Sequence, residues 1–299
     1  MAGHAGVVKR AGAARGDLLA AAVLLPPALL LFTVFVALPI GQGAWYSLFN
    51  WDGYATPTNF VGLKNYVRLL ADGVFAHALA NNGLIIVVSL LVQLPLALGV
   101  ALLLARRGTS TTGFRTIFFL PYMLADIAAG LIWRLVYDGD YGLLSTLVRA
   151  LGGPAIYPLA DRNFAFPAVL AVIVWKYFGF HMMLYVAGLQ QIDKHLYEAA
   201  GIDGANAWQR FLHITLPGLA PMVRLSVFFS VVGSLQFFDM VAALTGGGPL
   251  NATHTMVSYL YFFGMTRMRV GFGSAVGVVL FAVCVSFASG YRRLFMRRD

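Results

Sequence analysis

Apolar residues in this chain of 299 residues gather into six long runs that are separated by more polar stretches. A helix needs about 20 mostly apolar residues to cross the hydrocarbon core of a bilayer. The pattern therefore predicts an all-α, polytopic membrane protein with six spans, at 18–40, 84–105, 117–137, 164–190, 222–245 and 271–291. Pro26, Pro27 and Pro95 lie inside these runs, and neighbouring helices can satisfy the backbone groups that they leave free.

Two of the intervening stretches have helical patterns of their own. Residues 63–79 place apolar side chains at helical spacing, which predicts a helix lying along the outer membrane surface. The loop at about 191–221 contains a second such stretch, 197–217, which is amphipathic and polar. The loop predicts a helix over 194–202, a turn at Gly204, and a second amphipathic helix that stops at Pro217.

Composition supports the membrane assignment, because 60% of the residues are hydrophobic and only 11% are charged, against about a quarter charged in soluble domains. The net charge of +9 is distributed over the ends of the apolar runs, which favours a membrane surface over nucleic acid. With a cytoplasmic N-terminus, thirteen of the 21 Lys and Arg residues fall on the inner side, as the positive-inside rule requires. We therefore expect a cytoplasmic tail at 1–17, a retained first span, a membrane unit at 18–291, and a basic cytoplasmic tail at 292–299. Loop 191–221 is then cytoplasmic.

Several kinds of chemistry have no motif in this chain. No P-loop surrounds any of the four lysines, and neither H-E-x-x-H nor G-x-S-x-G occurs. The one cysteine, Cys284, allows neither an intrachain disulfide nor a cysteine-based metal site. We expect no catalytic, cofactor or metal site in this chain, so the energy for any transport comes from another chain or an ion gradient. An intramembrane enzyme that uses Asp126 and Asp239 as acids is the remaining alternative of that class.

Polar residues at membrane depth are the remaining candidates for a functional role, because they are costly there. They are Asp126, Arg134, Lys176, Gln236 and Asp239. Arg134, Lys176 and Asp239 could instead reach an interface or pair with one another, whereas Asp126 lies nearer mid-span and favours a cavity. Aromatic residues crowd spans three to five, and such a lining suits the C–H faces of a sugar, although helix packing also explains them.

The cytoplasmic stretch resembles a known motif. Its order is Glu198-Ala199-Ala200, then Gly204, then Ile214, and finally Leu216-Pro217. This spacing resembles the EAA motif of bacterial ABC-importer permease subunits. Residues 60–72, 114–122 and 236–249 are similar to the carbohydrate-uptake branch of that family, to both its maltose-transporter F type and its glycerol-phosphate-transporter A type.

The resemblance implies a six-span permease of the type I importer fold in the bacterial inner (plasma) membrane. It would pair with a second, homologous permease, with two ATPase subunits that bind ATP and Mg, and with an extracytoplasmic solute-binding protein. In the family, the motif couples the ATPase to the spans, which assigns that role to Glu198, Ala199, Ala200, Gly204, Ile214, Leu216 and Pro217. An ATP-independent carrier or channel is the rival from another class.

The resemblance also implies a pathway for a sugar-like substrate. The positions that match it are Tyr122, Asp126, Tyr177, Phe180, Ser230, Ser234 and Phe237. Asp126 stands where the maltose-type subunit has a small hydroxyl residue, and Lys176 stands where it has an apolar one, so maltose itself is in doubt. A sugar, a polyol and a glycerol-phosphate-type solute all remain open as substrates.

Overall fold

A computed structural model describes residues 23–105 and 109–295 of the chain. The expected tail 1–17, the first residues of span one, and the end of the tail 292–299 lie outside the described residues. The described residues form helices and one isolated β-bridge between Phe49 and Phe60. The all-α prediction is confirmed.

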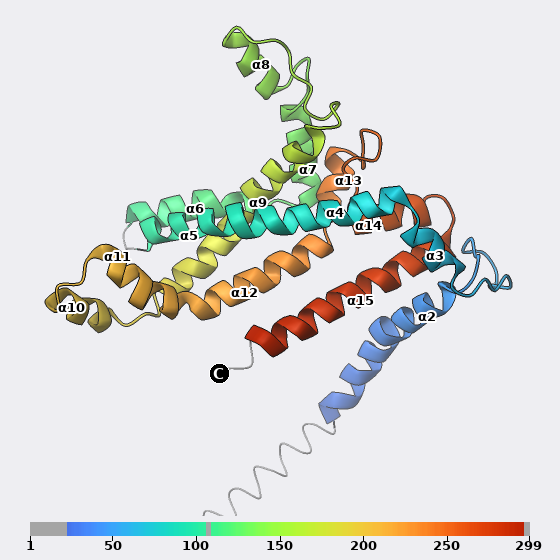
Figure 1. The fold of residues 1–299 in the computed structure, drawn as a ribbon, viewed down its shortest axis with the longest axis horizontal. Coiled ribbons are helices and arrows are strands. Elements are labelled where there is room, and N and C mark those ends of the chain that lie inside the picture. Colours follow the sequence, from blue (N-terminus) through green and yellow to red (C-terminus); the bar gives the residue numbers. More distant parts are fainter. Residues whose placement is uncertain (1–22, 106–108, 296–299) are drawn as a thin grey trace, which may run out of the picture.

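The helices and π-helical segments (η) follow one another along the chain as in Figure 1. The described part of the first helix starts at Val23 and runs into η1 and α2. The elements are η1 (Thr33–Ala37), α2 (Leu38–Tyr46), α3 (Lys64–Leu70), α4 (Gly73–Val88), η2 (Ser89–Gln93), α5 (Leu94–Leu104), α6 (Thr109–Met123), α7 (Asp126–Val136), α8 (Leu143–Ala150), α9 (Ala165–Leu189), α10 (Lys194–Ile202), α11 (Ala207–Arg210), η3 (Phe211–Thr215), α12 (Leu216–Leu235), α13 (Asp239–Leu244), α14 (Met256–Tyr259), η4 (Leu260–Met265) and α15 (Val270–Phe295).

Five helices of the described chain are long and apolar enough to cross a membrane: Val23–Tyr46, Gly73–Leu104, Ala165–Leu189, Ala207–Leu235 and Val270–Phe295. The third predicted span is not one straight helix, because α6 and α7 meet at 96°. The predicted span 222–245 is also wrong at its end, since α12 stops at Leu235 and α13 starts separately at Asp239. Asp239 is therefore exposed in the first turn of a short helix rather than inside a span.

Three of the long helices contain a π-helical turn directly before a Leu-Pro pair. The amides of Leu38, Leu94 and Leu216 bond to the carbonyl five residues back, and Pro39, Pro95 and Pro217 follow them. Proline has no amide hydrogen and its ring crowds the carbonyl of the preceding turn, and the wider π turn makes room for that ring. The helix through Pro217 therefore continues to Leu235, and the expectation that it stops at Pro217 is wrong.

The predicted surface helix 63–79 is divided in two. The Asp72 carboxylate accepts bonds from the amides of Val74 and Phe75 and so starts α4, which continues directly into the second span. Leu69 at the end of α3, and Phe75 and Ala78 in α4, are buried with residues of α14 and α15. The stretch therefore packs against the bundle as two helices, because Asp72 ends the first turn region and caps the N-terminus of α4.

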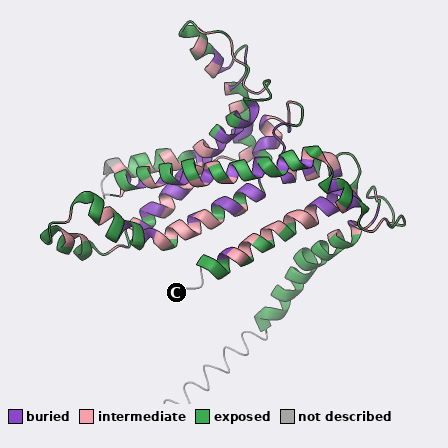
Figure 2. Ribbon diagram, viewed as in Figure 1, coloured by how far each residue is buried: buried purple, intermediate pink, exposed green. Residues whose placement is uncertain are grey.

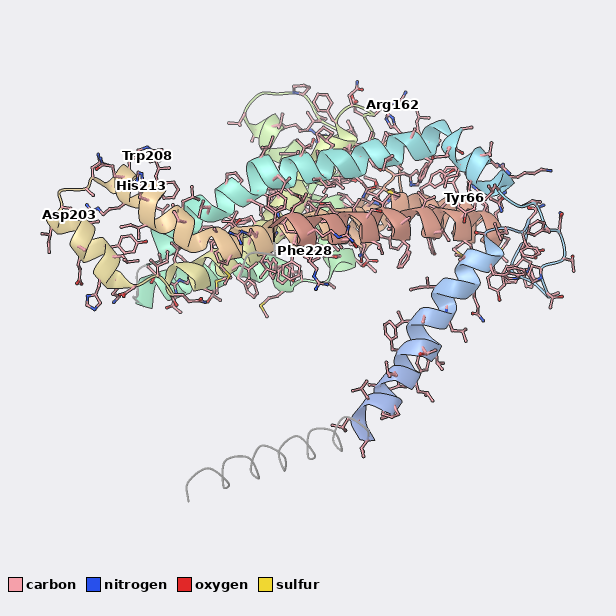
Figure 3. All side chains as sticks on the ribbon, turned by 60° about the horizontal axis from the view of Figure 1, so that its bottom comes forward. Tyr66, Arg162, Asp203, Trp208, His213 and Phe228 are labelled. Atoms are coloured by element: carbon pink, nitrogen blue, oxygen red, sulfur yellow. The ribbon has the colours of Figure 1, made fainter. Side chains whose placement is uncertain are left out.

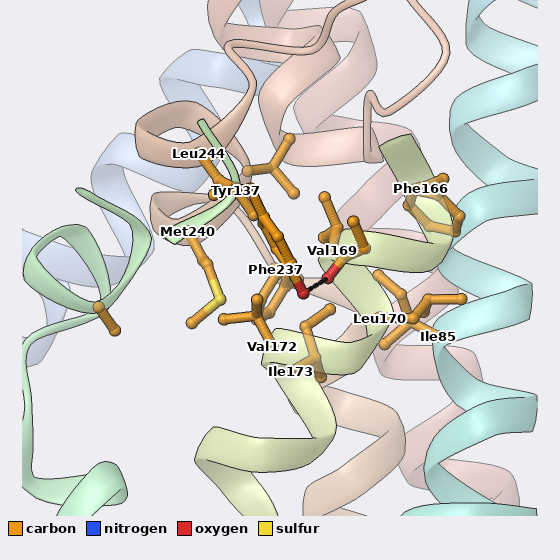
Figure 4. Packing of buried hydrophobic residues seen from close by; sticks show 13 residues of the cluster. Ile85, Tyr137, Phe166, Val169, Leu170, Val172, Ile173, Phe237, Met240 and Leu244 are labelled. Atoms are coloured by element: carbon orange, nitrogen blue, oxygen red, sulfur yellow. Dashed lines mark hydrogen bonds between the residues drawn. The ribbon is translucent and has the colours of Figure 1, made fainter. Parts of the chain in front are cut away.

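The largest buried cluster lies where α7, α9 and α13 meet (Figure 4). In it the hydroxyl of Tyr137 donates to the carbonyl of Ala168 at 3.3 Å. Burial is concentrated along α9, whereas the described part of the first span is mostly exposed and has no buried residue (Figure 2). That span contacts α15 only near its C-terminal end, so lipid or another chain must cover its apolar face.

A buried lysine lies at the break of the third span. The ammonium of Lys176, in α9, lies 2.9 Å from the Asp126 carboxylate and also donates to the carbonyl of Leu124. Asp126 is the first residue of α7, so its charge also faces the positive end of that helix. The two charged residues that differ from the family pattern, Asp126 and Lys176, thus pair with each other. Lys176 also satisfies the Leu124 carbonyl at the bend.

A glycine allows α9 to approach α6 closely. A Cβ atom added to Gly179 would lie 2.1 Å from the carbonyl oxygen of Phe118. We expect Gly179→Ala to lower the free energy of unfolding by about 1–3 kcal/mol, because two backbones would have to separate. Gly99→Ala is the matched control, since nothing lies within 4 Å of its added Cβ, and alanine favours a helix interior. Thermal unfolding in detergent checks both, and equal melting temperatures would refute the close packing.

The pair between Lys176 and Asp126 can be tested by a double-mutant cycle. Lys176 is 2% exposed and Asp126 is 32% exposed, so Asp126→Leu strands the more deeply buried charge. We expect Asp126→Leu to cost about 3–5 kcal/mol, Lys176→Met to cost less, and the double variant to recover most of the loss. Thermal unfolding of the purified variants measures this coupling. Additive losses would show that the two groups do not act as a pair.

Candidate functional site

A cavity of about 320 Å³ lies among α4, η2, α6, α9 and α12. Its walls are mostly apolar or aromatic, with a small number of polar side chains among them. The lining residues are Ile85, Ser89, Gln93, Tyr122, Ile173, Tyr177, Phe180, His181, Phe229, Ser230, Gly233, Ser234 and Phe237. This balance is typical of a site for a small organic molecule.

Aromatic rings form a continuous arc around this cavity. Tyr122 stacks on Phe180, with 4.9 Å between the ring centroids, and meets Tyr177 edge to face at 6.1 Å. Tyr177 in turn meets Phe237 edge to face at 6.1 Å, and Phe180 meets Phe229 at 6.0 Å. The arc joins α6, α9 and α12 and offers flat apolar faces to a ligand.

The polar groups of the cavity lie mainly on η2 and α12. Gln93 and Ser230 are both buried, and the Gln93 Oε1 and Ser230 Oγ atoms have no hydrogen-bond partner in the described chain. Ser234 donates to the carbonyl of Ser230 at 2.7 Å. The ring of His181 is 2.5 Å from the Ser226 hydroxyl, so that histidine is bonded to α12.

Six of the seven residues expected along the substrate pathway line this single cavity. They are Tyr122, Tyr177, Phe180, Ser230, Ser234 and Phe237. Asp126 does not line it, because its carboxylate lies behind the ring of Tyr177 and accepts the Tyr177 hydroxyl at 2.8 Å and 2.9 Å. Asp126 therefore orients a wall residue, and the assignment of the other six to substrate remains a prediction.

The sequence analysis missed the contribution of the second span. Ser89 and Gln93 are four residues apart and both line the cavity. They are polar residues inside an apolar run, the same signal that singled out Asp126, and a four-residue spacing places them on one helix face. They were not weighed among the candidate residues. His181 was missed in the same way.

The residues of the EAA-like motif form an exposed helical hairpin. Glu198, Ala199 and Ala200 lie in α10, as predicted, and the chain then reverses at Gly204, whose φ of +76° lies in the left-handed region. The amide of Ala205 donates to the carbonyl of Ala200 at 2.8 Å and closes the turn. Asn206 and Gln209 form a capping box that starts α11.

The hairpin extends beyond the end of the bundle, where Asp203, Trp208 and His213 lie together, far from Tyr66 (Figure 3). Leu196, Ile202 and Trp208 expose large apolar surfaces there. At its base the Tyr197 hydroxyl is 2.9 Å from the Thr215 hydroxyl. Ile214 and Pro217 line a groove between the two arms, and Leu216 is exposed at the start of α12. All seven motif residues thus belong to one hairpin.

Within the described residues, no group of three or more His, Cys, Asp or Glu could hold a metal ion. The carboxylate of Glu198 is 3.1 Å from His195 Nδ1, and both side chains are largely exposed. The geometry is suited to binding and docking.

Comparison with known proteins gives the family. Residues 93–298 match the model described as "Binding-protein-dependent transport system inner membrane component". The chain is 35% identical to the diacetylchitobiose uptake system permease protein NgcF of Streptomyces coelicolor, over 87% of this chain and 78% of the relative. It is 35% identical to the sn-glycerol-3-phosphate transport system permease protein UgpA of Brucella abortus, over 92% and 94%.

The fold also matches a solved structure. A chain of a bacterial alginate ABC transporter, crystallised in complex with an alginate pentasaccharide-bound periplasmic protein, superposes with a TM-score of 0.80. The identity is 23%, with 95% of this chain and 96% of that chain covered. The six-span permease architecture is thereby confirmed, with the third span bent. The protein belongs to the family of binding-protein-dependent transport system inner membrane components.

Proposed function

We propose that this chain is the permease subunit of an ATP-binding-cassette importer for a carbohydrate-like solute. The observation that carries the proposal is the joint presence of an exposed hairpin at one end of the bundle and a ligand-sized cavity inside it. The uptake of diacetylchitobiose by one relative's system supports a carbohydrate, as does the aromatic arc of the cavity.

The hairpin is joined to the cavity by a single helix. Ala207–Leu235 is continuous through α11, η3 and α12, and Ser230 and Ser234 lie near its far end. At 1.5 Å per residue, about 35 Å separate Ala207 from Ser230 along the axis. A movement imposed on the hairpin would therefore be transmitted directly to one wall of the cavity.

The proposed machine needs other chains to work. Two ATPase subunits, which bind ATP and Mg, would dock on the exposed apolar residues of the hairpin, and ATP-driven closure would move it. A second permease would complete the pathway, and a solute-binding protein would deliver the cargo to the outer side. Alternating access then opens the cavity to one side at a time. This arrangement places the hairpin and both termini in the cytoplasm and the spans in the bacterial inner membrane.

Gly204 offers a direct test of ATPase docking. Its left-handed backbone disfavours any residue with a Cβ atom by about 1–2 kcal/mol, so Gly204→Val should distort the turn between α10 and α11. We expect recovery of ATPase subunits on the affinity-purified permease to fall about tenfold, as a loss of 1.4 kcal/mol in docking gives. Glu198→Ala should retain docking better, because the turn is unchanged.

Gly201→Ala is the matched control, because Gly201 lies inside α10 and nothing lies within 4 Å of its added Cβ. This variant should recover ATPase subunits at the native level. If no ATPase co-purifies even with the native chain, while solute uptake continues, the chain is an ATP-independent carrier and the proposal fails.

A further inference from the structure

Basic residues at the end of the bundle opposite the hairpin are concentrated in one place. The predicted orientation puts six Lys and Arg residues on that side, namely Lys64, Arg68, Arg149, Arg162, Arg267 and Arg269. Four of them lie in two short segments, 64–68 and 267–269, shortly before the spans that begin at Gly73 and Val270 (Figure 1). Positive charge is disfavoured on this side of a membrane, so a local cluster there indicates an anionic partner.

The two segments meet at one aromatic cluster. The Arg68 guanidinium lies over the ring of Phe272, 5.6 Å from its centroid, and that of Arg267 lies over Phe263 at 4.0 Å. Tyr259 stacks on Phe263, with 4.5 Å between centroids, and meets Phe272 edge to face at 6.3 Å. The tyrosine joins the two rings, so the guanidinium groups lie at opposite ends of a single cluster.

This cluster has a positive charge that the described residues do not neutralise. The ion pairs of the described chain involve neither Arg68 nor Arg267, and both arginines are exposed. Asp72 is the acid whose charge acts on Tyr259 together with the two arginines. Its carboxylate already accepts two backbone amides at the start of α4. Two guanidinium groups and one carboxylate leave one net positive charge for an anion.

The helix α3, which carries Arg68, has three different faces. One face is buried through Asn65 and Leu69, and the Asn65 side chain donates to two carbonyl groups just after α2, which fixes the helix on the bundle. Lys64 and Arg68 are four residues apart and form a basic face. Between 67% and 75% of the side-chain surface is exposed on a third, apolar face, formed by Leu63, Val67 and Leu70.

A phospholipid matches both exposed faces of α3. Because two spans begin here, the arginines lie near the depth of the headgroups, where a phosphate can reach them. The acyl chains of the same molecule would cover the apolar face, as they do for amphipathic helices at a membrane surface. An acidic protein would match the charge alone. A net negative headgroup is favoured over a zwitterionic one, whose ammonium group opposes binding to arginine.

We propose that α3 and the turn before α15 form a binding site for an anionic phospholipid in the leaflet opposite the hairpin. Arg68 and Arg267 bind the phosphate of its headgroup, and the apolar face of α3 contacts its acyl chains. The bound lipid holds α3 and the start of α15 together at the membrane surface. The inference rests on the proposed function only for the identification of this leaflet as the outer one.

The test measures which lipid lies beside α3 when the full chain is reconstituted in bilayers of phosphatidylethanolamine and phosphatidylglycerol. Cys284→Ser removes the native thiol, and Val67→Cys carries a bimane fluorophore. Either lipid is brominated in turn, so that quenching gives their relative binding constant at position 67. We expect phosphatidylglycerol to be preferred about fivefold, as one net charge near an anionic lipid gives. Leu91→Cys, which is exposed within the second span, is the control reporter with no preference.

The basic residues are then varied in the Val67→Cys background. Arg68→Gln and Arg267→Gln should each reduce the preference to about one, because each removes the net positive charge. Arg68→Lys should retain most of it, which separates the charge from the packing of the arginine on Phe272. Arg162→Gln is the matched control, because it removes an exposed charge from the same side but outside the cluster. It should leave the preference unchanged.

Three results would overturn the lipid site. They are equal quenching by the two lipids at position 67, a preference that survives both Arg68→Gln and Arg267→Gln, and an equal loss of preference in Arg162→Gln. A fluorophore at position 67 that neither lipid quenches, while the one at position 91 is quenched, would also overturn it, because another chain would then cover α3.

Failure of the lipid site can be separated from failure of the proposed function. Lipid preference at position 67 requires no ATPase, so Gly204→Val should leave it unchanged while it weakens ATPase docking. Loss of the preference in a chain that still recovers ATPase subunits overturns the lipid site alone. A preference that persists while the native chain recovers no ATPase overturns the proposed function and supports the lipid site.

Discussion

The need of every backbone polar group for a partner at membrane depth governs this structure. The third span bends by 96° between Met123 and Asp126, which removes helical hydrogen bonds where water is scarce. The ammonium of Lys176 supplies a donor to Leu124 and a counter-charge to Asp126. Without this group the bend would leave an uncompensated carboxylate and a free carbonyl, and each is costly in an apolar environment. Lys176 therefore compensates both groups at the bend.

The cavity depends on that bend. Because α7 turns away from α6, the ring of Tyr177 is held between Asp126 and the cavity, and its hydroxyl donates to both carboxylate oxygens. Tyr177 then fixes the edge-to-face contacts with Tyr122 and Phe237. The charged pair thus acts on the cavity through one aromatic residue, and contributes no net charge to its walls. A cavity without charged lining residues, next to the pair of Lys176 and Asp126, is the physical result.

Much of this fold could be predicted from the sequence, for identifiable reasons. The apolar runs located all six spans because lipid allows few alternatives to a helix, and the hairpin followed from periodicity and a glycine. The bend at Leu124 could not be located from the sequence, because Lys176, the donor that stabilises it, is 52 residues away along the chain. The continuation through Pro217 was missed because a π turn, which depends on local packing, makes room for the proline ring. Gln93 is a polar residue within an apolar run, the same signal that singled out Asp126 and Gln236, and it could have been predicted in the same way.

The hairpin and the cavity have different roles in the proposed cycle: the hairpin docks the ATPase, and the cavity holds the solute. The hairpin motif lies in one continuous segment, so it can be recognised from the sequence. Its turn at Gly204 has a positive φ, which favours glycine over residues with a Cβ atom. The cavity is assembled from four separate segments, so its specificity resides in their relative positions. The helix Ala207–Leu235 belongs to both. In the proposed cycle, a tilt of this helix at the hairpin would move Ser230 and Ser234 relative to η2, because η2 lies on a different span. Such a movement would change the shape of the cavity, and so link docking at the hairpin to the affinity for the cargo.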